Sequence, residues 1–382
     1  MTAPQSLVFE ASGLPAHVCV LWPDADSARG CPRGDMRLAY DPSIGRISNL
    51  AFDARCVEYA EGYENSLGFS EFFQGYLDDL AQDLADRHDL SGKRVIEIGS
   101  GDGDFISSIC RRSGAQGIGY EPSWAAERPD TLEDGKVSIV RDFFPPEGSP
   151  APAAELVVCR QVLEHIEEPE PFLEAVRAAC VPGATVVFEV PNASDTLGRV
   201  SWTDLIYEHV HYFTAGSLAR QLAKAGFEVT HAQDTYSGQF VLVEATVPAS
   251  GAGSVPDSFA DLEQLGGEVQ AFAEEWSKRC NSWTEQLDAW GAEGKRISIW
   301  GTGARGVSFL NLADKHRRIE GAVDLNPRKH GRYVAGSAQC VAAPEWLLEF
   351  KPDVIIIMNP NYESEIRTSL AELGLSPEIR LA

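Results

Sequence analysis

Two stretches of the sequence share a pattern in which an apolar run ends in a glycine-rich turn that leads into a helix. The first stretch is VIEIGSGDGDF, residues 95–105, and the second is ISIWGTGARG, residues 297–306. Glycines at such a turn allow a tight bend and a close approach of the backbone to a ligand. A strand that leads through a turn into a helix is the repeating unit of a doubly wound α/β sheet. The sequence therefore predicts two such sheets.

The hydrophobic pattern predicts the elements around the first turn. Apolar residues recur at spacings of three and four over residues 69–84, which indicates an amphipathic helix. After it, β-rich runs alternate with helical stretches, as in a parallel sheet covered on both faces. The predicted strands are 95–98, 116–120, 138–140, 155–159, 185–190, 228–232 and 239–247, and the predicted helices are 104–112, 169–180 and 217–225.

The rest of the chain divides by the same criteria. The stretch PASGAGSVP, residues 248–256, is small and unpatterned and is typical of a domain boundary. A long helix over 262–290 follows, and then a second alternating unit. The expected fold class is α/β, with two doubly wound Rossmann-like domains and a small irregular N-terminal lobe. The expected boundaries are 1–68 for the lobe, 69–247 for the central domain, 248–294 for the linker and long helix, and 295–382 for the C-terminal domain.

Composition excludes several classes of function. The chain has 382 residues, with 57 acidic and 32 basic side chains and a formal net charge of −25. Such a surface repels nucleic-acid phosphates and anionic lipids, so we expect neither nucleic acid nor a membrane as partner. No apolar run approaches the length of a membrane span, and no secretion signal opens the chain. The eight cysteines form no CxxC pair, which favours a reducing cytoplasm.

An acidic residue accompanies the first glycine turn. Glu121 lies 22 residues beyond Gly99, at the end of the next predicted strand. A carboxylate at this position can accept hydrogen bonds from the ribose hydroxyls of an adenosine-type ligand. Dinucleotide-binding enzymes share this arrangement, so the pattern alone leaves the ligand open.

Further landmarks resemble class I S-adenosylmethionine-dependent methyltransferases. Glu97 immediately precedes IGSGDG, in the form E-x-G-x-G-x-G. RDF ends the third strand, CRQVLEHI follows the fourth, and FEVPN forms the fifth strand and its exit. The resemblance implies S-adenosylmethionine as cofactor and S-adenosylhomocysteine as product. The cofactor-binding residues that it implies are Glu97, Gly99, Gly101, Gly103, Glu121, Pro122, Asp142, Phe143, Arg160 and Gln161.

A cluster of histidines, tyrosines and one acid follows the fifth strand, in the sequence YEHVHYF at 207–213. An imidazole can remove a proton near neutral pH, and an adjacent carboxylate can orient it and stabilise its charged form. Metal ligation is possible on composition. No third and fourth ligand stands at a recognisable spacing, so we predict no metal.

The form E-H-x-x-Y-F after the fifth strand, with a second Rossmann-like domain behind it, resembles the nucleotide-sugar C-methyltransferases. That family methylates carbon 3 of a 4-keto-deoxysugar carried on a nucleoside diphosphate. The resemblance implies His209 as the base, Glu208 as its carboxylate neighbour and His165 as a further active-site histidine, with His211 and Tyr207 beside them. The substrate-binding residues expected in this part of the chain are Tyr63, Asn65, Asn192, Tyr212 and Gln239.

Two features depart from the family pattern. The family begins with a zinc unit of two CxxC pairs, whereas this chain has Cys19 and Cys31 alone, with Asp41 and Ile44 at the places of two further cysteines. We therefore predict no structural zinc, and a lobe held by packing. Ile206 stands where the family usually has a tyrosine, two residues before the glutamate. If that tyrosine helps to hold the keto sugar, its absence concerns C-methylation specifically.

The second glycine turn fits G-x-G-x-x-G, and Asp324 ends the strand that follows it. This pattern alone suggests NAD, yet it also resembles the C-terminal domain of the same methyltransferase family. A helix N-terminus with glycine amides is a good anion site. We expect it to hold a substrate diphosphate or nucleoside through Gly301, Gly303, Arg305 and Asn326. A purely structural role and a second cofactor are the alternatives.

The combined hypothesis is a methyltransferase that acts on a nucleotide-linked deoxysugar, with C-methylation next to a keto group. The alternative within the class is O- or N-methylation of a sugar or natural-product intermediate. Two other classes are an NAD-dependent oxidoreductase centred on residue 301 and a silent scaffold that binds S-adenosylmethionine. The expected partner is a small-molecule substrate, a nucleoside-diphosphate sugar, and the expected state is a monomer or homodimer.

Overall fold

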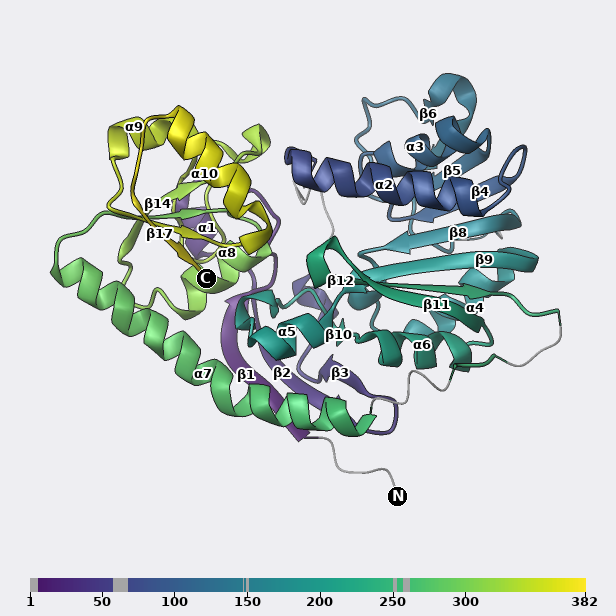
Figure 1. Ribbon diagram of the computed structural model, residues 1–382, viewed down its shortest axis with the longest axis horizontal. Helices are drawn as coiled ribbons and strands as arrows, with labels where there is room; N and C mark the ends of the chain where they lie inside the picture. The colour runs from purple at the N-terminus through teal and green to yellow at the C-terminus, as the bar shows by residue number, and fades with distance from the viewer. Residues whose placement is uncertain (1–5, 58–67, 147, 149–150, 250–252, 257–261) are drawn as a thin grey trace.

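The computed structural model describes residues 6–57, 68–146, 148, 151–249, 253–256 and 262–382. A central α/β domain lies on one side of the molecule and a smaller α/β domain on the other (Figure 1). The N-terminal strands lie between them, and one long helix runs along the edge of the assembly. Part of the predicted linker 248–256 falls outside the described residues.

The central domain is built on a sheet in the order β11-β12-β9-β8-β4-β5-β7-β6. The strands from β9 to β7 are parallel, whereas β12 runs antiparallel to both β9 and β11, and β6 runs antiparallel to β7. The bounds are β4 (Arg94–Ile98), β5 (Gln116–Tyr120), β6 (Thr131–Leu132), β7 (Val137–Val140), β8 (Ala154–Arg160), β9 (Cys180–Pro191), β11 (Glu228–Thr235) and β12 (Phe240–Thr246). The predicted strands of this region are confirmed, and the predicted 185–190 begins five residues earlier.

Helices cover both faces of this sheet and begin at recognisable caps. The side chain of Ser70 accepts a hydrogen bond from the Phe73 amide at the start of α2, and Thr214 and Ser217 form a capping box at the start of α6. These caps satisfy amides that have no partner inside the helix. The helices are α2 (Glu71–Arg87), α3 (Asp104–Ser113), α4 (Pro169–Ala178), α5 (Ala193–Arg199) and α6 (Ala215–Lys224).

The C-terminal domain has an all-parallel sheet in the order β15-β14-β13-β16-β17. Its central strands are buried on both faces, as the apolar run in β16 requires. The bounds are β13 (Ile297–Trp300), α8 (Ala304–Leu312), β14 (Ile319–Val323), β15 (Val341–Ala342), α9 (Leu347–Phe350), β16 (Val354–Ile357), α10 (Glu363–Glu372) and β17 (Glu378–Leu381). Two doubly wound sheets are therefore present, as predicted.

The N-terminal lobe is an antiparallel sheet that includes a strand from the central domain. Its order is β1-β2-β3-β10, with β1 (Ser6–Pro15), β2 (Arg33–Asp41), β3 (Arg46–Asn49) and β10 (His211–Tyr212), and a short helix α1 (Ala25–Arg29) precedes β2. His211 pairs with Ser48 and Tyr212 with Ile47. The lobe thus holds the segment that contains the histidine cluster.

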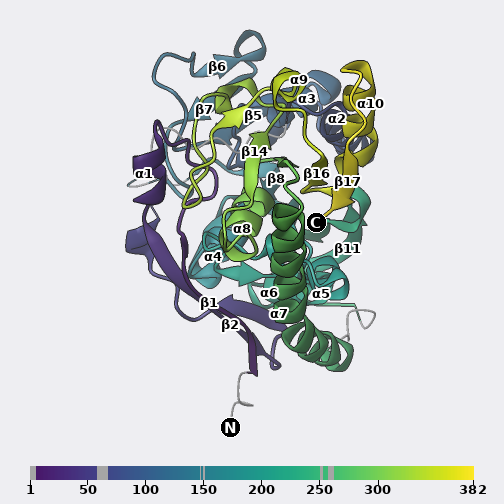
Figure 2. The same ribbon diagram turned by 90° about the vertical axis from the view of Figure 1, so that its left-hand side faces the viewer.

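One apolar core joins the lobe, the long helix and the C-terminal sheet. Helix α7 (Leu262–Ala292) lies along β1 and reaches α8, as the two views show (Figures 1 and 2). The rings of Phe9 in β1 and Trp276 in α7 lie 4.5 Å apart, and Trp283 contacts Phe309 of α8 at 5.1 Å. The lobe therefore packs on α7 rather than standing as a separate unit.

The packing of the lobe on the histidine segment gives a first prediction. A Cβ at Gly34 of β2 would lie far inside van der Waals contact with the Tyr207 ring. We expect Gly34→Ala to lower the free energy of unfolding by about 1–3 kcal/mol, since crowding a packed site forces a shift. Denaturant unfolding measures it. The matched control is Gly75→Ala in α2, where nothing lies within 4 Å and alanine is favoured in the helix. Equal stability of the two variants would contradict the prediction.

Candidate functional site

The first glycine turn has the backbone geometry of a ligand cradle. Gly99, Gly101 and Gly103 have positive φ angles of 72°, 53° and 79°, which glycine adopts at little cost. A Cβ at Gly101 would meet nothing within 4 Å, so the backbone there is open. Gly103 is also the N-cap of α3, so the first amides of that helix have no carbonyl partner within the helix.

Glu121 lies directly beside this open backbone. Its carboxylate accepts hydrogen bonds from the Gly101 amide at 2.8 Å and from the Ser123 amide at 3.0 Å. Pro122 follows it at the carboxyl end of β5. The acid predicted to hold a ribose is therefore at the turn, with oxygens that can accept further hydrogen bonds.

The remaining predicted cofactor residues surround the turn in different ways. Glu97 is buried in β4 and accepts from the Ile106 amide at 3.1 Å, and burial raises its pKa to about 8. This hydrogen bond joins the first turn of α3 to strand β4. Asp142 follows β7 and accepts from the Phe143 amide, and the Phe143 ring is 58% exposed, as a ring that stacks on a ligand would be.

Arg160 and Gln161 belong to a buried network after β8. The Arg160 guanidinium pairs with Glu189 of β9 at 3.0 Å and lies over the Phe105 ring. Tyr76 of α2 also donates to Glu189, and Gln161 has a positive φ of 55°. Burial raises the pKa of Glu189 to about 8. This network fixes the loop after β8 against α2.

The features of the turn fit S-adenosylmethionine. Open glycine backbone, a carboxylate at the end of β5 and an exposed ring after β7 suit an adenosine group. The chemistry of this donor set matches the cofactor that the sequence predicts.

The loop after β8 contacts the glycine turn, and the same loop contains a histidine. A Cβ at Gly99 would collide with the Val162 side chain, so the two loops are in contact. His165 ends the short helix η3 (Leu163–His165) and its Nδ1 lies 2.9 Å from the Glu208 carbonyl oxygen. A carbonyl only accepts, so Nδ1 carries the proton and Nε2 holds the lone pair.

His209 lies against His165, with ring centroids 4.8 Å apart and nearly perpendicular planes. Within the described residues, neither ring nitrogen of His209 has a hydrogen-bond partner, and Nδ1 is buried. Burial and the neighbouring His165 hold the pKa of His209 well below 6.5. The ring is therefore neutral at neutral pH and carries a lone pair that can accept a proton.

The structure corrects the expected role of Glu208. Its carboxylate is fully buried and accepts from the Val18 amide at 3.2 Å, with His17 Nδ1 at 3.3 Å. The side chain thus points into the N-terminal lobe, away from His209. Residues 207–208 form a turn, and the contacts of Glu208 with the lobe show that the carboxylate next to His209 in sequence is not its hydrogen-bond partner.

Tyr207 and His211 are likewise anchors to the lobe, which corrects their expected catalytic role. The Tyr207 hydroxyl accepts from the Asp53 amide at 2.8 Å, and its ring stacks on Phe52. His211 places Nδ1 at 2.9 Å from Ser48 Oγ and Nε2 at 3.2 Å from the Glu167 carbonyl. Both ring nitrogens of His211 are occupied, and burial lowers its pKa to about 4.

Of the expected substrate-binding residues in this part of the chain, one lies beside His209 and another forms structural hydrogen bonds. Tyr212 lies beside His209, at 5.8 Å between ring centroids, and its hydroxyl bonds the backbone of Ile206. Asn192 caps α5 and donates to Asp234 and to the Gly238 carbonyl. Tyr63 and Asn65 lie outside the described residues.

Gln239 joins the two α/β domains. Its side-chain amide exchanges two hydrogen bonds with that of Asn359, at 2.9 and 3.1 Å. Close by, the hydroxyl groups of Tyr236 and Tyr362 lie 2.5 Å apart. Gln239 is therefore committed to the domain border rather than open to a substrate.

Lone-pair groups that can bind a metal gather at one place. Polar atoms of Glu164, His165 and His209 lie within 4.8 Å of one another. Two ligands of a tetrahedral zinc ion are about 3.4 Å apart, given bonds of about 2.1 Å. The group is wider than a zinc site, and no metal is assigned to it.

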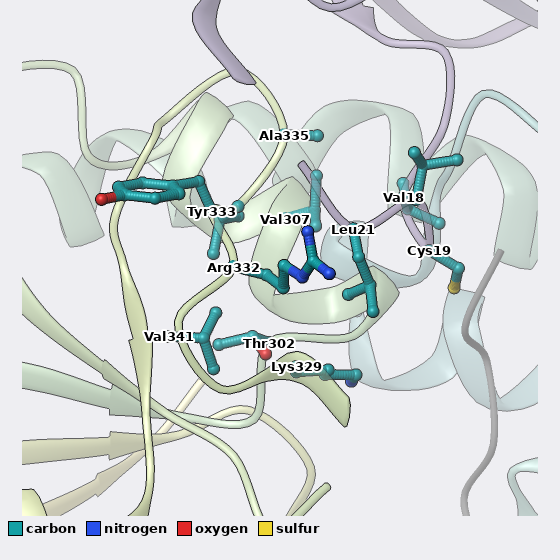
Figure 3. Close-up of a pocket in the computed structure, with 12 residues that line it drawn as sticks. Val18, Cys19, Leu21, Thr302, Val307, Lys329, Arg332, Tyr333, Ala335 and Val341 are labelled. Carbon is teal, nitrogen blue, oxygen red and sulfur yellow. The ribbon is translucent and has the colours of Figure 1, made fainter. Parts of the chain in front are cut away.

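The second glycine turn is already filled by the protein's own groups. Asp324 accepts from the Thr302 amide and hydroxyl, each at 2.8 Å, and pairs with Lys329 at 3.0 Å. Figure 3 shows Thr302 and Lys329 at the bottom of a narrow pocket that the N-terminal lobe closes from the other side. The pocket has a volume of about 10 Å³, little more than one water molecule needs.

Arg305 and Asn326 also have structural partners, which corrects the expected anion site. Arg305 forms an ion pair with Asp204 of the central domain. Asn326 accepts from the Arg328 amide through its side chain. The Gly301 and Thr302 amides of this turn donate to Val323 and Asp324, so neither is available to a phosphate.

Several residues of the site carry no signal that the sequence analysis used. Glu164 lies in the middle of LEH and is 1% exposed, and Glu189 and Tyr76 form the buried network beside Arg160. Arg328 of the C-terminal domain reaches Asp102 in the first glycine turn at 3.3 Å. The LEH sequence was the one signal that could have singled out Glu164.

Comparison with known proteins agrees with this geometry. Residues 69–232 match the family described as a methyltransferase domain, and residues 260–375 match the C-methyltransferase C-terminal domain. C-methyltransferase NovU of Streptomyces niveus is 28% identical over 291 residues, which cover 72% of this chain and 68% of that protein.

Other similarities cover a smaller share of the chain. The mitochondrial ubiquinone biosynthesis O-methyltransferase of Schizosaccharomyces pombe is 28% identical over 141 residues. The matched part covers 35% of this chain and 50% of that relative. The solved structure of magnesium protoporphyrin IX methyltransferase from Synechocystis PCC 6803 with bound SAH has a TM-score of 0.37 at 15% identity. It covers 46% of this chain and 83% of that one.

The fold, the glycine-turn site and the two matched family models define an S-adenosylmethionine-dependent methyltransferase. Within that class, the chain combines a methyltransferase domain with a C-methyltransferase C-terminal domain. Across the part of the chain that the structure describes, no helix is both long enough and apolar enough to cross a membrane.

The position of Glu121 gives a prediction for cofactor binding. We expect Glu121→Ala to weaken S-adenosylmethionine binding by about 10–100-fold, since hydrogen bonds to a charged group contribute about 1.5–3 kcal/mol. Calorimetric titration measures it. Glu127→Ala, an exposed glutamate six residues further on, is the control and should bind as the wild type does. Unchanged affinity in Glu121→Ala would remove this carboxylate from the cofactor site.

Proposed function

We propose that the enzyme methylates the carbon next to a keto group of a nucleotide-linked deoxysugar, with His209 as the base. The observation that carries the proposal is the neutral His209 ring, whose nitrogens have no partner among the described residues, beside the loops that surround the glycine turn. A carbon acceptor requires a base, because its C–H bond must be broken. The match to a C-methyltransferase C-terminal domain supports the same chemistry.

In the proposed reaction, one set of residues binds the cofactor and His209 transfers the proton. A keto group acidifies the neighbouring C–H, and His209 takes that proton and leaves the electron pair on carbon. S-adenosylmethionine, when bound, supplies a methyl group on a positively charged sulfur. The glycine turn and Glu121 hold the cofactor, and alignment of the acceptor with it supplies most of the acceleration.

The acceptor is proposed to lie at the border between the two α/β domains. The second glycine turn is filled by Asp324, so a diphosphate is not expected inside it. Arg328 brings a half-exposed guanidinium from the C-terminal domain to the first glycine turn, where a phosphate of the acceptor can meet it. A smaller acceptor methylated on oxygen or nitrogen is the alternative, which the similarity to ubiquinone O-methyltransferases favours.

The cellular setting is part of the same proposal. The structure describes all eight cysteines and joins none of them in a disulfide, as in a reducing cytoplasm. The net charge of −25 favours a small-molecule partner over nucleic acid or an anionic membrane. We propose that the enzyme works there as a monomer or a homodimer.

The nucleotide part of the acceptor can be tested by calorimetry. Titration of the S-adenosylhomocysteine-loaded enzyme with thymidine, uridine, guanosine and cytidine diphosphates should show saturable binding of one of them. Arg328→Ala should weaken that binding by about tenfold, since one charge-assisted hydrogen bond is lost. If none of the four binds, the acceptor is a free small molecule methylated on oxygen or nitrogen.

The base can be tested by exchange of the acceptor proton. In deuterated water, with S-adenosylhomocysteine in place of the cofactor, the wild type should exchange the C–H next to the keto group of a nucleotide-linked 4-keto-deoxysugar. His209→Ala should lower this exchange by about 100-fold or more, with cofactor affinity unchanged. His231→Ala, an exposed histidine on β11, is the control. Wild-type exchange in His209→Ala would exclude this residue as the base.

A further inference from the structure

Two polar groups beside the histidine pair are buried without a hydrogen-bond partner. Among the described residues, both carboxylate oxygens of Glu164 and Nδ1 of His209 are in this state. Glu164 is 1% exposed, so water from the surface does not solvate it. Buried polar groups in folded proteins are nearly always paired, so two such groups at one place require an explanation.

These groups face the same small volume. Glu164 Oε1 lies 4.0 Å from His165 Nε2, and one polar atom each of Glu164, His165 and His209 lie within 4.8 Å of one another. His165 and Glu164 come from η3, whereas His209 comes from the turn before β10. The Val210 amide donates to the Glu164 carbonyl at 2.8 Å, which ties the two segments together.

The proposed reaction creates a positive charge at this place. When His209 takes a proton, a buried imidazolium forms beside a second histidine, and both the burial and His165 disfavour it. A carboxylate nearby would offset this cost. Glu208 does not serve, because its oxygens contact His17 and the Val18 amide. Glu164 is the acid whose oxygens remain without a partner.

We propose that Glu164 is the positioning residue of the base. A rotation of the two side chains, whose polar atoms lie within 4.8 Å of each other, would let its carboxylate accept the Nδ1–H of His209 and would leave the lone pair on Nε2 for the acceptor proton. It also balances the positive charge that His209 then carries. A carboxylate that fixes the tautomer of a histidine base is a recurring device in acid–base catalysis. The inference rests on the proposed function, in which His209 removes the proton.

The surroundings of Glu164 set the pH range in which the pair works. Burial raises the pKa of Glu164 to about 8. The titratable groups around it are Cys159 near the end of β8, His165 in η3, His209 in the turn before β10 and Tyr212 in β10. No cation is among them. Glu164 is therefore protonated below this pH and becomes a carboxylate above it, so the base should gain strength as pH rises through about 8.

Histidine NMR tests the pair without any acceptor. The full-length enzyme, loaded with S-adenosylhomocysteine and labelled with ¹⁵N-histidine, is titrated from pH 6 to pH 9.5, and His209→Ala assigns the His209 signals. In the wild type we expect the Nδ1–H tautomer of His209 to become dominant with a midpoint near pH 8. Glu164→Gln should abolish this midpoint, while Glu168→Gln, an exposed glutamate in the same loop, should retain it.

Each outcome decides the inference. A His209 titration that is identical in Glu164→Gln and the wild type would overturn it, provided that the other histidine signals show an intact fold. Stoichiometric metal in the purified enzyme that is lost in Glu164→Gln would also overturn it. Turnover of a nucleotide-linked 4-keto-deoxysugar should fall at least about tenfold in Glu164→Gln, with unchanged cofactor affinity.

The design separates this inference from the proposed function. If Glu164→Gln changes the His209 tautomer but His209→Ala still exchanges the acceptor proton, the pair exists and the base assignment fails. If His209→Ala loses exchange but Glu164→Gln leaves both the tautomer and the turnover unchanged, the base stands and the pairing fails.

Discussion

The position of His209 depends on how firmly the N-terminal lobe holds the segment around it. Tyr207 bonds the backbone of Asp53, Glu208 bonds the Val18 amide, and His211 bonds Ser48. Strand β10 then pairs with β3 as part of the lobe's sheet. With its neighbours fixed in this way, His209 is the residue of the segment that is left to face His165. Of the cluster that looks wholly catalytic in sequence, Tyr207, Glu208 and His211 are thus anchors to the lobe, and His209 is the proposed base.

This arrangement makes the lobe part of the active site even though it supplies none of the proposed reacting groups. The lobe shares an apolar core with α7, whose far end packs on α8 of the C-terminal domain. A change at the lobe therefore reaches the site through packing, without contact to cofactor or acceptor.

The sequence predicted those features that depend on local patterns. The glycine turn at 99–103, the alternating strands and the long helix follow from spacing and from residue type, and the structure places them within a few residues. The partners of Tyr207 and Glu208 lie 154 and 190 residues away in sequence, and no local rule identifies them. The same holds for Arg305, whose charge suggests a phosphate until the fold brings Asp204 to it. The sequence does not single out Glu164, because its burial depends on tertiary packing.

The contacts between the two α/β domains differ in kind. Gln239 and Asn359 form an uncharged amide pair, whereas Arg328 and Asp102 meet through charges that are partly exposed. Mobile ions weaken exposed charge pairs far more than neutral hydrogen bonds. Salt therefore weakens the Arg328–Asp102 pair far more than the Gln239–Asn359 pair. At high ionic strength, the C-terminal domain should contact the first glycine turn less tightly while the amide pair keeps the two domains together.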